Sequence, residues 1–276
     1  MNAVLLGIVN VTDDSFSDGG AYLDPDAALA HARRLAEQGA DIIDLGAAAS
    51  NPRALPVAPE TEIARLRPLV DGLKRDGTKI SIDSFAVETQ RWALAQNVDF
   101  LNDIHGFPRP EFYPELARSS AKLIVMHAVN AAGPARREDA TPPNLYDHIV
   151  GFFDGRIAAL TKAGIDRARL ILDPGMGLFL GNSREASFRV LRRISDLKAA
   201  FGLPVLISVS RKSFLRPKGR PASQAGALTL AAELYAVGEG ADYIRTHDPQ
   251  ALRDGLFVLG NLEEQNVKEI AGGHLL

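Results

Sequence analysis

The feature that most constrains the fold of this chain is a repeated order of segments. A short, β-branched apolar run is followed each time by an amphipathic helical stretch. This order is typical of α/β proteins, because successive parallel strands need a crossover connection, usually a helix. The apolar runs lie at residues 4–11, 41–45, 79–82, 100–104, 122–126, 170–172, 204–209 and 243–245. The helical stretches lie at 25–38, 60–74, 87–96, 111–118, 144–163, 184–200, 223–239 and 250–265.

Eight such units in a row predict an α/β fold that is a single (β/α)8 TIM barrel. The length of 276 residues is close to that of known barrels of this kind. No Pro/Ser-rich linker divides the chain, so we expect one domain over residues 1–276. A doubly wound open sheet is the alternative that the pattern leaves open.

Composition excludes several classes of function. The chain has no cysteine, which rules out disulfides, thiolate metal sites and cysteine nucleophiles. Its 31 basic and 34 acidic residues give no electrostatic footprint for nucleic acid. There is no apolar run of about 18 residues that could span a membrane, and the N-terminal residues do not resemble a signal peptide. We therefore expect a cytoplasmic protein without nucleic-acid or membrane partners.

Polar side chains stand at the ends of nearly all the expected strands, which is where TIM barrels carry their active sites. They are Asn10, Asp44, Asp83, Ser84, Asn102, Asp103, His127, Asp173, Ser210, Arg211, Lys212, Arg245 and His247. Any one of the Asp or Asn residues alone could be a helix cap or a turn residue. Together, the carboxylates and amides suit a flat, nitrogen-rich heterocycle, and the cations suit an anion such as phosphate.

Six segments of the chain resemble motifs of the dihydropteroate synthase family. They are residues 7–20, Ile-Ser-Ile-Asp-Ser at 80–84, Leu-Asn-Asp-Ile at 101–104, Asp-Pro-Gly-Met-Gly at 173–177, Ser-Val-Ser-Arg-Lys-Ser at 208–213 and Arg-Thr-His-Asp at 245–248. The resemblance implies that 6-hydroxymethyl-7,8-dihydropterin pyrophosphate is joined to p-aminobenzoate, with release of pyrophosphate. It also implies Mg²⁺ as cofactor and a homodimer.

The same resemblance assigns roles to individual residues. Asp83, Asp173 and Lys212 would be catalytic and would hold the pterin together with Asn102. Met126 would add an apolar face to the pterin, unless it only packs in the core. Asn10, Arg245 and His247 would bind the pyrophosphate, and Asn10 would also meet the metal. The p-aminobenzoate pocket would be bordered by Phe16, Ser50, Pro52, Lys212 and Ser213.

Two segments depart from the usual family pattern. Where the family usually has Ser-Thr-Arg-Pro-Gly, this chain has Ser-Asn-Pro at 50–52, so Asn51 replaces a guanidinium in the p-aminobenzoate pocket. The segment 177–182 contains an added phenylalanine and glycine. Both changes are similar to those of the transferable, sulfonamide-resistance branch. We expect Phe179 to be a wall that rejects the bulkier drug, with Gly181 giving the backbone freedom to place it. The alternative is that Phe179 packs under its own loop.

Other interpretations stay open on the sequence alone. The chain could be a drug-sensitive housekeeping synthase, a barrel methyltransferase that acts on a methylated folate with a corrinoid partner, or a pterin-binding protein without activity. His105 and His127 could be metal ligands with Asp103, although their spacing favours histidines that are only hydrogen-bonded. Lys212 could form a Schiff base, although its flanking motif favours ligand binding.

Overall fold

The eight strands form a closed barrel in the computed structural model, which describes residues 2–12, 24–48, 56–130 and 139–272. They are β1 (Val4–Asn10), β2 (Ile42–Gly46), β3 (Lys79–Asp83), β4 (Phe100–Asp103), β5 (Lys122–Met126), β6 (Leu170–Asp173), β7 (Leu206–Ile207) and β8 (Tyr243–Thr246). Neighbouring strands pair in parallel, in the order β6-β5-β4-β3-β2-β1-β8-β7. A parallel bridge between Leu172 and Val205 joins the two end strands, so the barrel prediction is confirmed and the open sheet is excluded.

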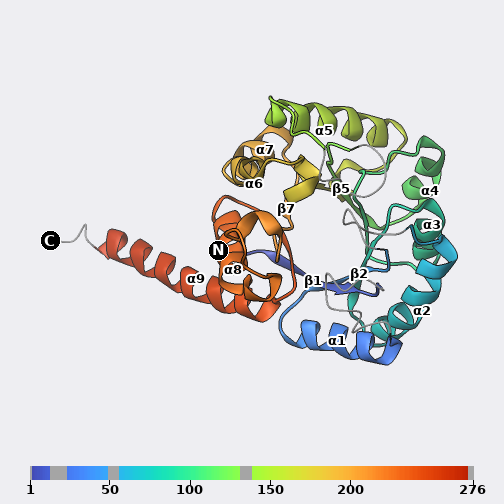
Figure 1. Cartoon of the computed structure of the whole chain (residues 1–276), viewed down its shortest axis with the longest axis horizontal. Helices are drawn as coiled ribbons and strands as arrows, with labels where there is room; N and C mark the ends of the chain where they lie inside the picture. Colours follow the sequence, from blue (N-terminus) through green and yellow to red (C-terminus); the bar gives the residue numbers. More distant parts are fainter. Residues whose placement is uncertain (1, 13–23, 49–55, 131–138, 273–276) are drawn as a thin grey trace.

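Helices surround the strands in a ring (Figure 1). They are α1 (Pro25–Glu37), α2 (Pro59–Arg75), α3 (Val87–Ala95), α4 (Tyr113–Arg118), α5 (Leu145–Lys162), α6 (Arg184–Leu191), α7 (Ile194–Phe201), α8 (Gly226–Gly238) and α9 (Pro249–Gly272). The first of them shows why these stretches are helical. The Asp24 side chain accepts a backbone N–H two residues on, and Ala28, Ala32 and Leu35 then fall on one buried face.

Several predicted elements differ from the structure. The helices expected over 111–118 and 223–239 are each preceded by a short 3-10 helix, Pro110–Phe112 and Ala222–Gln224, and the helix expected over 250–265 continues to Gly272. The single helix expected over 184–200 is divided into α6 and α7. The division falls at Arg193, whose guanidinium lies 3.4 Å from the ring centroid of Tyr146 on α5 and pairs with Asp196. The strand expected over 204–209 is only Leu206–Ile207, because the chain leaves the sheet soon after this point.

The interior of the barrel is divided into an apolar layer and a polar layer. Its buried plug consists of Leu6, Ile42, Phe100, Ile124, Ile171, Leu206 and Tyr243. Successive side chains on a strand point to opposite faces, so the residues two positions further along also point inward. On five of these strands those residues are Asp44, Asn102, Met126, Asp173 and Arg245. The polar groups are therefore held in one layer directly above the plug.

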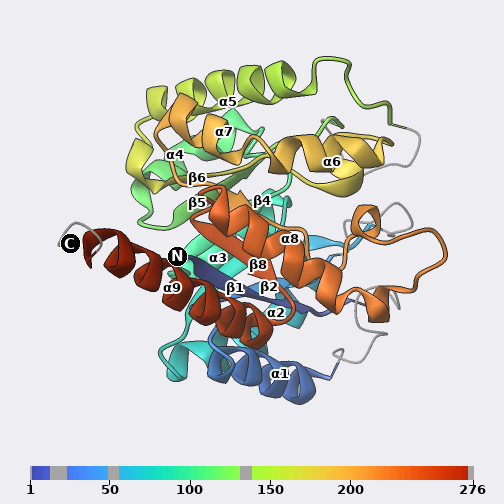
Figure 2. The same ribbon diagram turned by 90° about the vertical axis from the view of Figure 1, so that its left-hand side faces the viewer.

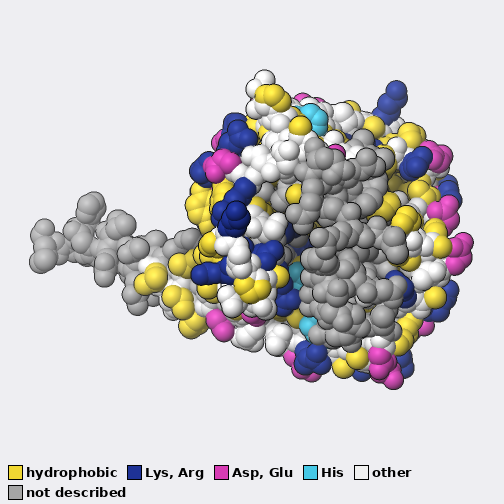
Figure 3. Space-filling view, viewed as in Figure 1, with side chains coloured by type: hydrophobic (Ala, Val, Ile, Leu, Met, Phe, Trp, Pro, Cys, Tyr) yellow, Lys and Arg dark blue, Asp and Glu magenta, His cyan; other side chains and the backbone are white. Residues whose placement is uncertain are grey.

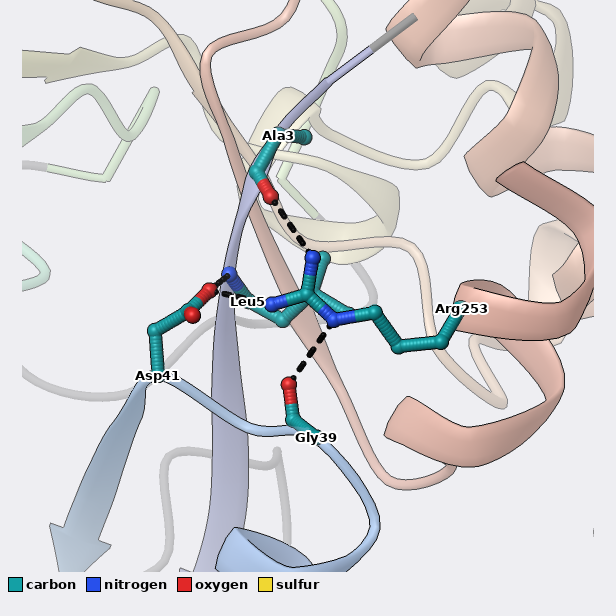
Figure 4. Close-up of polar contacts among 5 residues, drawn as sticks. All are labelled: Ala3, Leu5, Gly39, Asp41 and Arg253. Atoms are coloured by element: carbon teal, nitrogen blue, oxygen red, sulfur yellow. Dashed lines mark hydrogen bonds and ion pairs between the residues drawn. The ribbon is translucent and has the colours of Figure 1, made fainter. Parts of the chain in front are cut away.

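The last helix packs against α8 at its start and then extends away from the barrel (Figures 1 and 2). Arg253 anchors this helix to the N-terminal ends of β1 and β2 (Figure 4). Its guanidinium donates to the carbonyls of Gly39 (3.0 Å) and Ala3 (3.4 Å) and to the carboxylate of Asp41 (2.6 Å). The carboxylate of Asp41 also accepts the backbone N–H of Leu5, so Asp41 links α9 to β1 at the start of β2.

Within the part of the chain that is described, no helix combines the length and apolar character that crossing a membrane requires.

Candidate active site

An arginine between two carboxylates forms one side of the polar layer. Arg245 of β8 donates from Nε to Oδ2 of Asp44 (2.5 Å) and from Nη2 to Oδ2 of Asp83 (2.7 Å). The Asp44 side chain is completely buried, whereas those of Arg245 and Asp83 are 15% and 21% exposed. Asp83 therefore presents its carboxylate to the mouth of the barrel, while Asp44 holds the guanidinium from behind.

Burial changes the protonation of this group. It raises the pKa of Asp83 to about 7, with the nearby Arg245 opposing the shift and Asp44 adding to it. Burial alone would lower the pKa of Arg245, but the carboxylates of Asp44 and Asp83 outweigh it and raise that pKa. The arginine thus stays charged, and Asp83 can exchange a proton near neutral pH.

The opposite side of the layer is formed by Asp173 and Lys212. Asp173 ends β6, and its Oδ1 accepts the backbone N–H of Gly175 (2.8 Å). Lys212 donates from Nζ to the carbonyl of Met176 (3.0 Å) and lies 4.9 Å from the ring centroid of Phe179. Burial raises the pKa of Asp173 to about 6 and lowers the pKa of Lys212 to about 8. An ammonium group and an aromatic face thus meet beside a carboxylate.

Two buried acceptors in this layer have no hydrogen-bond partner within the described residues: Oδ1 of Asn102 and Oδ1 of Asp44. Buried polar atoms in proteins are normally hydrogen-bonded, so a ligand N–H donor fits the unpartnered oxygen of Asn102, whereas Asp44 lies behind Arg245. Met126 is 5% exposed and lies in the same inward register at the end of β5. A flat ring with several N–H groups matches this combination of acceptors and an apolar side chain.

Two further residues lie at the upper rim. His247 follows β8, and its Nδ1 lies 2.9 Å from Oγ of Ser210. Burial, followed by the charges of Arg211 and Arg245, keeps the pKa of His247 well below its usual value, so this imidazole is neutral near pH 7. Asn10 ends β1, half-buried and paired in register with Gly46 of β2. Figure 3, viewed as in Figure 1, shows Lys and Arg side chains gathered on the α8 side of this end.

Comparisons with known proteins agree with this arrangement. The profile of the family described as "Pterin binding enzyme" matches residues 6–247. The dihydropteroate synthase type-2 of Escherichia coli is 59% identical over 262 residues, which cover 95% of this chain and 96% of that protein. The chain belongs to the dihydropteroate synthase family.

Solved structures of dihydropteroate synthases have the same fold as this chain. A Xanthomonas albilineans dihydropteroate synthase with 4-aminobenzoic acid has a TM-score of 0.85 and 32% identity, covering 95% of this chain and 93% of that one. The same bacterium's enzyme in complex with 7,8-dihydropteroate has a TM-score of 0.82 and 32% identity, covering 95% and 94%. As a member of this family, the chain is a transferase.

The structure brings most of the site residues predicted from the sequence to one mouth, and their roles there stay predictions. Asn10, Asp83, Asn102, Met126, Asp173, Phe179, Lys212, Arg245 and His247 all lie at this end of the barrel. Ser213 is exposed at the start of the short 3-10 helix Ser213–Leu215. Phe16, Ser50, Asn51 and Pro52 lie outside the described residues. Asp44 was predicted to lie at this mouth with the other polar strand ends but was assigned no individual role, although its place two residues after Ile42 signals an inward side chain.

The predictions for the histidines can be checked in part. His127 is hydrogen-bonded, as expected: its Nδ1 lies 3.1 Å from the carbonyl of Pro174, and its Nε2 lies 2.9 Å from Nδ1 of His148. A carbonyl only accepts, so Nδ1 of His127 carries the proton and Nε2 accepts from His148. Within the described ranges, no three His, Asp or Glu residues are grouped so that they could hold a metal ion.

Proposed function

We propose that this dihydropteroate synthase family member joins 6-hydroxymethyl-7,8-dihydropterin pyrophosphate to p-aminobenzoate, and that it continues to do so in the presence of sulfonamides. The observation that carries the first part is the buried polar layer, in which Asp83 and Asp173 face one mouth with the unpartnered Oδ1 of Asn102. These acceptors would bind the N–H groups of the pterin ring, and Lys212 would donate to a ring acceptor.

The proposed reaction is a substitution at the CH₂ group attached to the pterin. The amine of p-aminobenzoate forms the new C–N bond, the C–O bond to pyrophosphate breaks with its electron pair, and the amine loses a proton. Positive charge develops on the CH₂ group and the pterin as the leaving group departs. The carboxylates of Asp83 and Asp173 would stabilise this charge, because preorganised groups in a buried site act strongly on charge that forms in the transition state.

The leaving group would be bound at the upper rim by Asn10, His247 and Arg245. His247 is neutral, so it would donate a hydrogen bond rather than contribute charge. Mg²⁺ prefers few protein ligands together with phosphate oxygens and water, so the amide oxygen of Asn10 would be its protein ligand at this rim. Bound there, Mg²⁺ would neutralise charge on the departing pyrophosphate.

Phe179 supports the second part of the proposal. Its side chain is half-buried, and its ring lies beside the ammonium of Lys212. This position favours a wall at the mouth over a residue that only packs under its loop. Gly181 has φ +93° and ψ −164°, a conformation that is essentially restricted to glycine. Ser213, together with Phe16, Ser50, Asn51 and Pro52, which lie outside the described residues, is proposed for the p-aminobenzoate pocket from the sequence alone.

The first experiment is pyrophosphate release from the pterin substrate with Mg²⁺, with and without p-aminobenzoate and then with sulfamethoxazole. Release that requires p-aminobenzoate and persists with the drug is the expected result. Release that the drug abolishes would refute the insensitivity. Folded protein that releases no pyrophosphate would refute the synthase activity.

The role of Phe179 is tested by Phe179→Ala and by deletion of Phe179 together with Gly181. Both changes should restore inhibition by sulfamethoxazole, because they remove the wall that collides with the bulkier drug. Leu178→Ala is the matched control, since it shortens a neighbouring half-buried side chain of the same loop. An active Phe179→Ala variant that remains insensitive would contradict the proposal.

We also propose that the chain forms a homodimer through α8 and α9. Large apolar side chains are exposed on these two helices: Tyr235 (45%), Phe257 (73%), Val258 (55%) and Leu262 (53%). Exposed apolar residues grouped in this way are typical of interaction surfaces. Sedimentation velocity should give the mass of a dimer, and Phe257→Asp should shift the equilibrium toward the monomer.

A further inference from the structure

The loop that follows β6 carries three groups of the proposed site. They are the carboxylate of Asp173, the carbonyl of Met176 that accepts from Lys212, and the ring of Phe179. Glycines with positive φ precede and follow the short 3-10 turn within this loop: Gly175 has φ +75° and Gly181 has φ +93°. Such a loop needs contacts from outside to keep one conformation.

Those contacts come from the connection between β5 and α5. The backbone carbonyl of Phe179 itself accepts the backbone N–H of Val129 (2.9 Å). Three residues further along the loop, the backbone N–H of Asn182 donates to the carbonyl of Asp139 (2.8 Å). The backbone of the loop is therefore bonded to this connection both at and beyond the aromatic residue.

Thr141 makes the central contact. Its hydroxyl donates to the carbonyl of Leu180 (2.8 Å) and accepts the backbone N–H of Ser183 (3.1 Å). One hydroxyl thus joins the two sides of Gly181. A Cβ atom on Gly181 would lie 2.6 Å from the backbone nitrogen and from Oγ1 of Thr141, so the two segments can approach this closely only because residue 181 is glycine.

From this geometry we propose that Thr141 is the positioning residue that fixes the ring of Phe179 over Lys212. Without its hydroxyl, the Leu180 carbonyl and the Ser183 N–H lose their shared partner. On its C-terminal side, the turn that carries Phe179 then keeps the backbone bond between Asn182 and Asp139 but loses both bonds to the Thr141 side chain. The consequence for drug selectivity rests on the proposed function of Phe179 as a wall. A ring that is free to move would reject the bulkier drug less well while still admitting p-aminobenzoate.

The test compares Thr141→Val, which keeps the shape but removes the hydroxyl, with Thr141→Ser, which keeps the hydroxyl. Thr161→Val is the matched control, because the hydroxyl of Thr161 also donates to a carbonyl (Ile157, 2.8 Å) but within α5. The first readout is the ¹⁹F NMR signal of 4-fluorophenylalanine placed at position 179 in each full-length protein. The second readout is kcat, KM for p-aminobenzoate and the inhibition constant of sulfamethoxazole.

Thr141→Val should shift or broaden the fluorine signal and lower the inhibition constant of sulfamethoxazole about tenfold, with kcat within about twofold of wild type. Thr141→Ser and Thr161→Val should match wild type in both readouts. An unchanged fluorine signal in folded Thr141→Val would overturn the proposal. If Phe179→Ala itself does not restore inhibition, the wall function fails, and the fluorine signal still decides whether Thr141 positions the ring.

Discussion

Asp44 is the residue whose role is the most indirect. It is completely buried and bonds Arg245, which in turn bonds Asp83. Asp44 would therefore act on the pterin site by holding a guanidinium, without touching the substrate. Removing one partner of a buried ion pair leaves the other charge uncompensated, so the arrangement depends strongly on this carboxylate.

We expect Asp44→Asn to lower kcat/KM for the pterin substrate by about tenfold or more, because Arg245 would lose its partner behind the site. KM for p-aminobenzoate should change little. Asp76→Asn is the control, since it removes the carboxylate partner of Arg33 in an exposed pair. Steady-state kinetics with each substrate varied in turn measures both effects, and equal losses in the two variants would argue against a positioning role for Asp44.

The pH dependence of the reaction should report three groups of the polar layer. Deprotonation of Asp173 (pKa about 6) and Asp83 (pKa about 7) gives the charged acceptors, so kcat/KM for the pterin substrate should rise over this range. Deprotonation of Lys212 (pKa about 8) removes a charged donor, so the rate should fall above it. Because these groups interact, the profile gives macroscopic values. If kcat/KM of Asp173→Asn rises with pH in the same way as that of wild type, Asp173 does not contribute to the rise and its assignment is wrong.

For individual residues, the sequence identifies the residue type and its place at the end of a strand, but not the residue with which its side chain forms a hydrogen bond or ion pair. Asp83, Asn102 and Asp173 could be found because each ends an apolar run. The bond between Asp44 and Arg245 joins residues 201 positions apart and depends on the register of β2, β1 and β8, which the sequence pattern does not specify. The hydroxyl of Thr141 lies in an irregular connection with no periodic pattern, so its contact was not predictable either.

The elements themselves follow from local patterns more directly than the contacts between them. Apolar runs locate all eight strands because each strand is buried on both faces. The pattern fails at α6 and α7, where apolar periodicity continues across Arg193 while packing against Tyr146 turns the chain. The pattern also predicts β7 to be longer than it is, because apolar residues continue beyond Ile207, the last paired residue of this strand.

The attachment of α9 gives a prediction for an element. Arg253→Met keeps the aliphatic stem but removes the three hydrogen bonds to Gly39, Ala3 and Asp41 (Figure 4). We expect a loss of about 1–2 kcal/mol in the free energy of unfolding, since these groups are partly exposed, with kcat unchanged because the contact lies at the far end of the barrel. Denaturant titration measures the first and the pyrophosphate assay the second. Arg192→Met, which removes an exposed pair with Glu185, should change neither.

For the whole molecule, stability should depend on pH through a carboxyl group outside the polar layer. Burial raises the pKa of Glu233 on α8 to about 8, from the ordinary value of 4.5 for a free glutamate side chain. The protonated form is favoured in the folded state, so the stabilisation is complete below the unfolded pKa and is lost as the pH rises through about 8. Each unit of pKa difference corresponds to about 1.4 kcal/mol.

Glu233→Gln should therefore reduce the fall in stability between pH 5 and pH 8 that wild type shows. Urea unfolding at several values of pH measures the slope, and Glu185→Gln, an exposed carboxylate, is the control. Parallel pH slopes for wild type and Glu233→Gln would show that Glu233 does not contribute to this dependence. Asp83 and Asp173 contribute in the same direction, so a residual slope should remain in the variant.

The bridge between Leu172 and Val205 that closes the barrel has a mechanical consequence. Within the described residues, β6 and β7 are joined by this isolated bridge, whereas the other neighbouring strands are joined by ladders. Asp173 ends β6 on one side of the bridge, and Lys212 follows β7 on the other. A pterin that bonds both side chains would span the bridge and act as a strut across it. The proposed pterin contacts would thus lie on both sides of this single bridge, and a bound pterin would add a link across it.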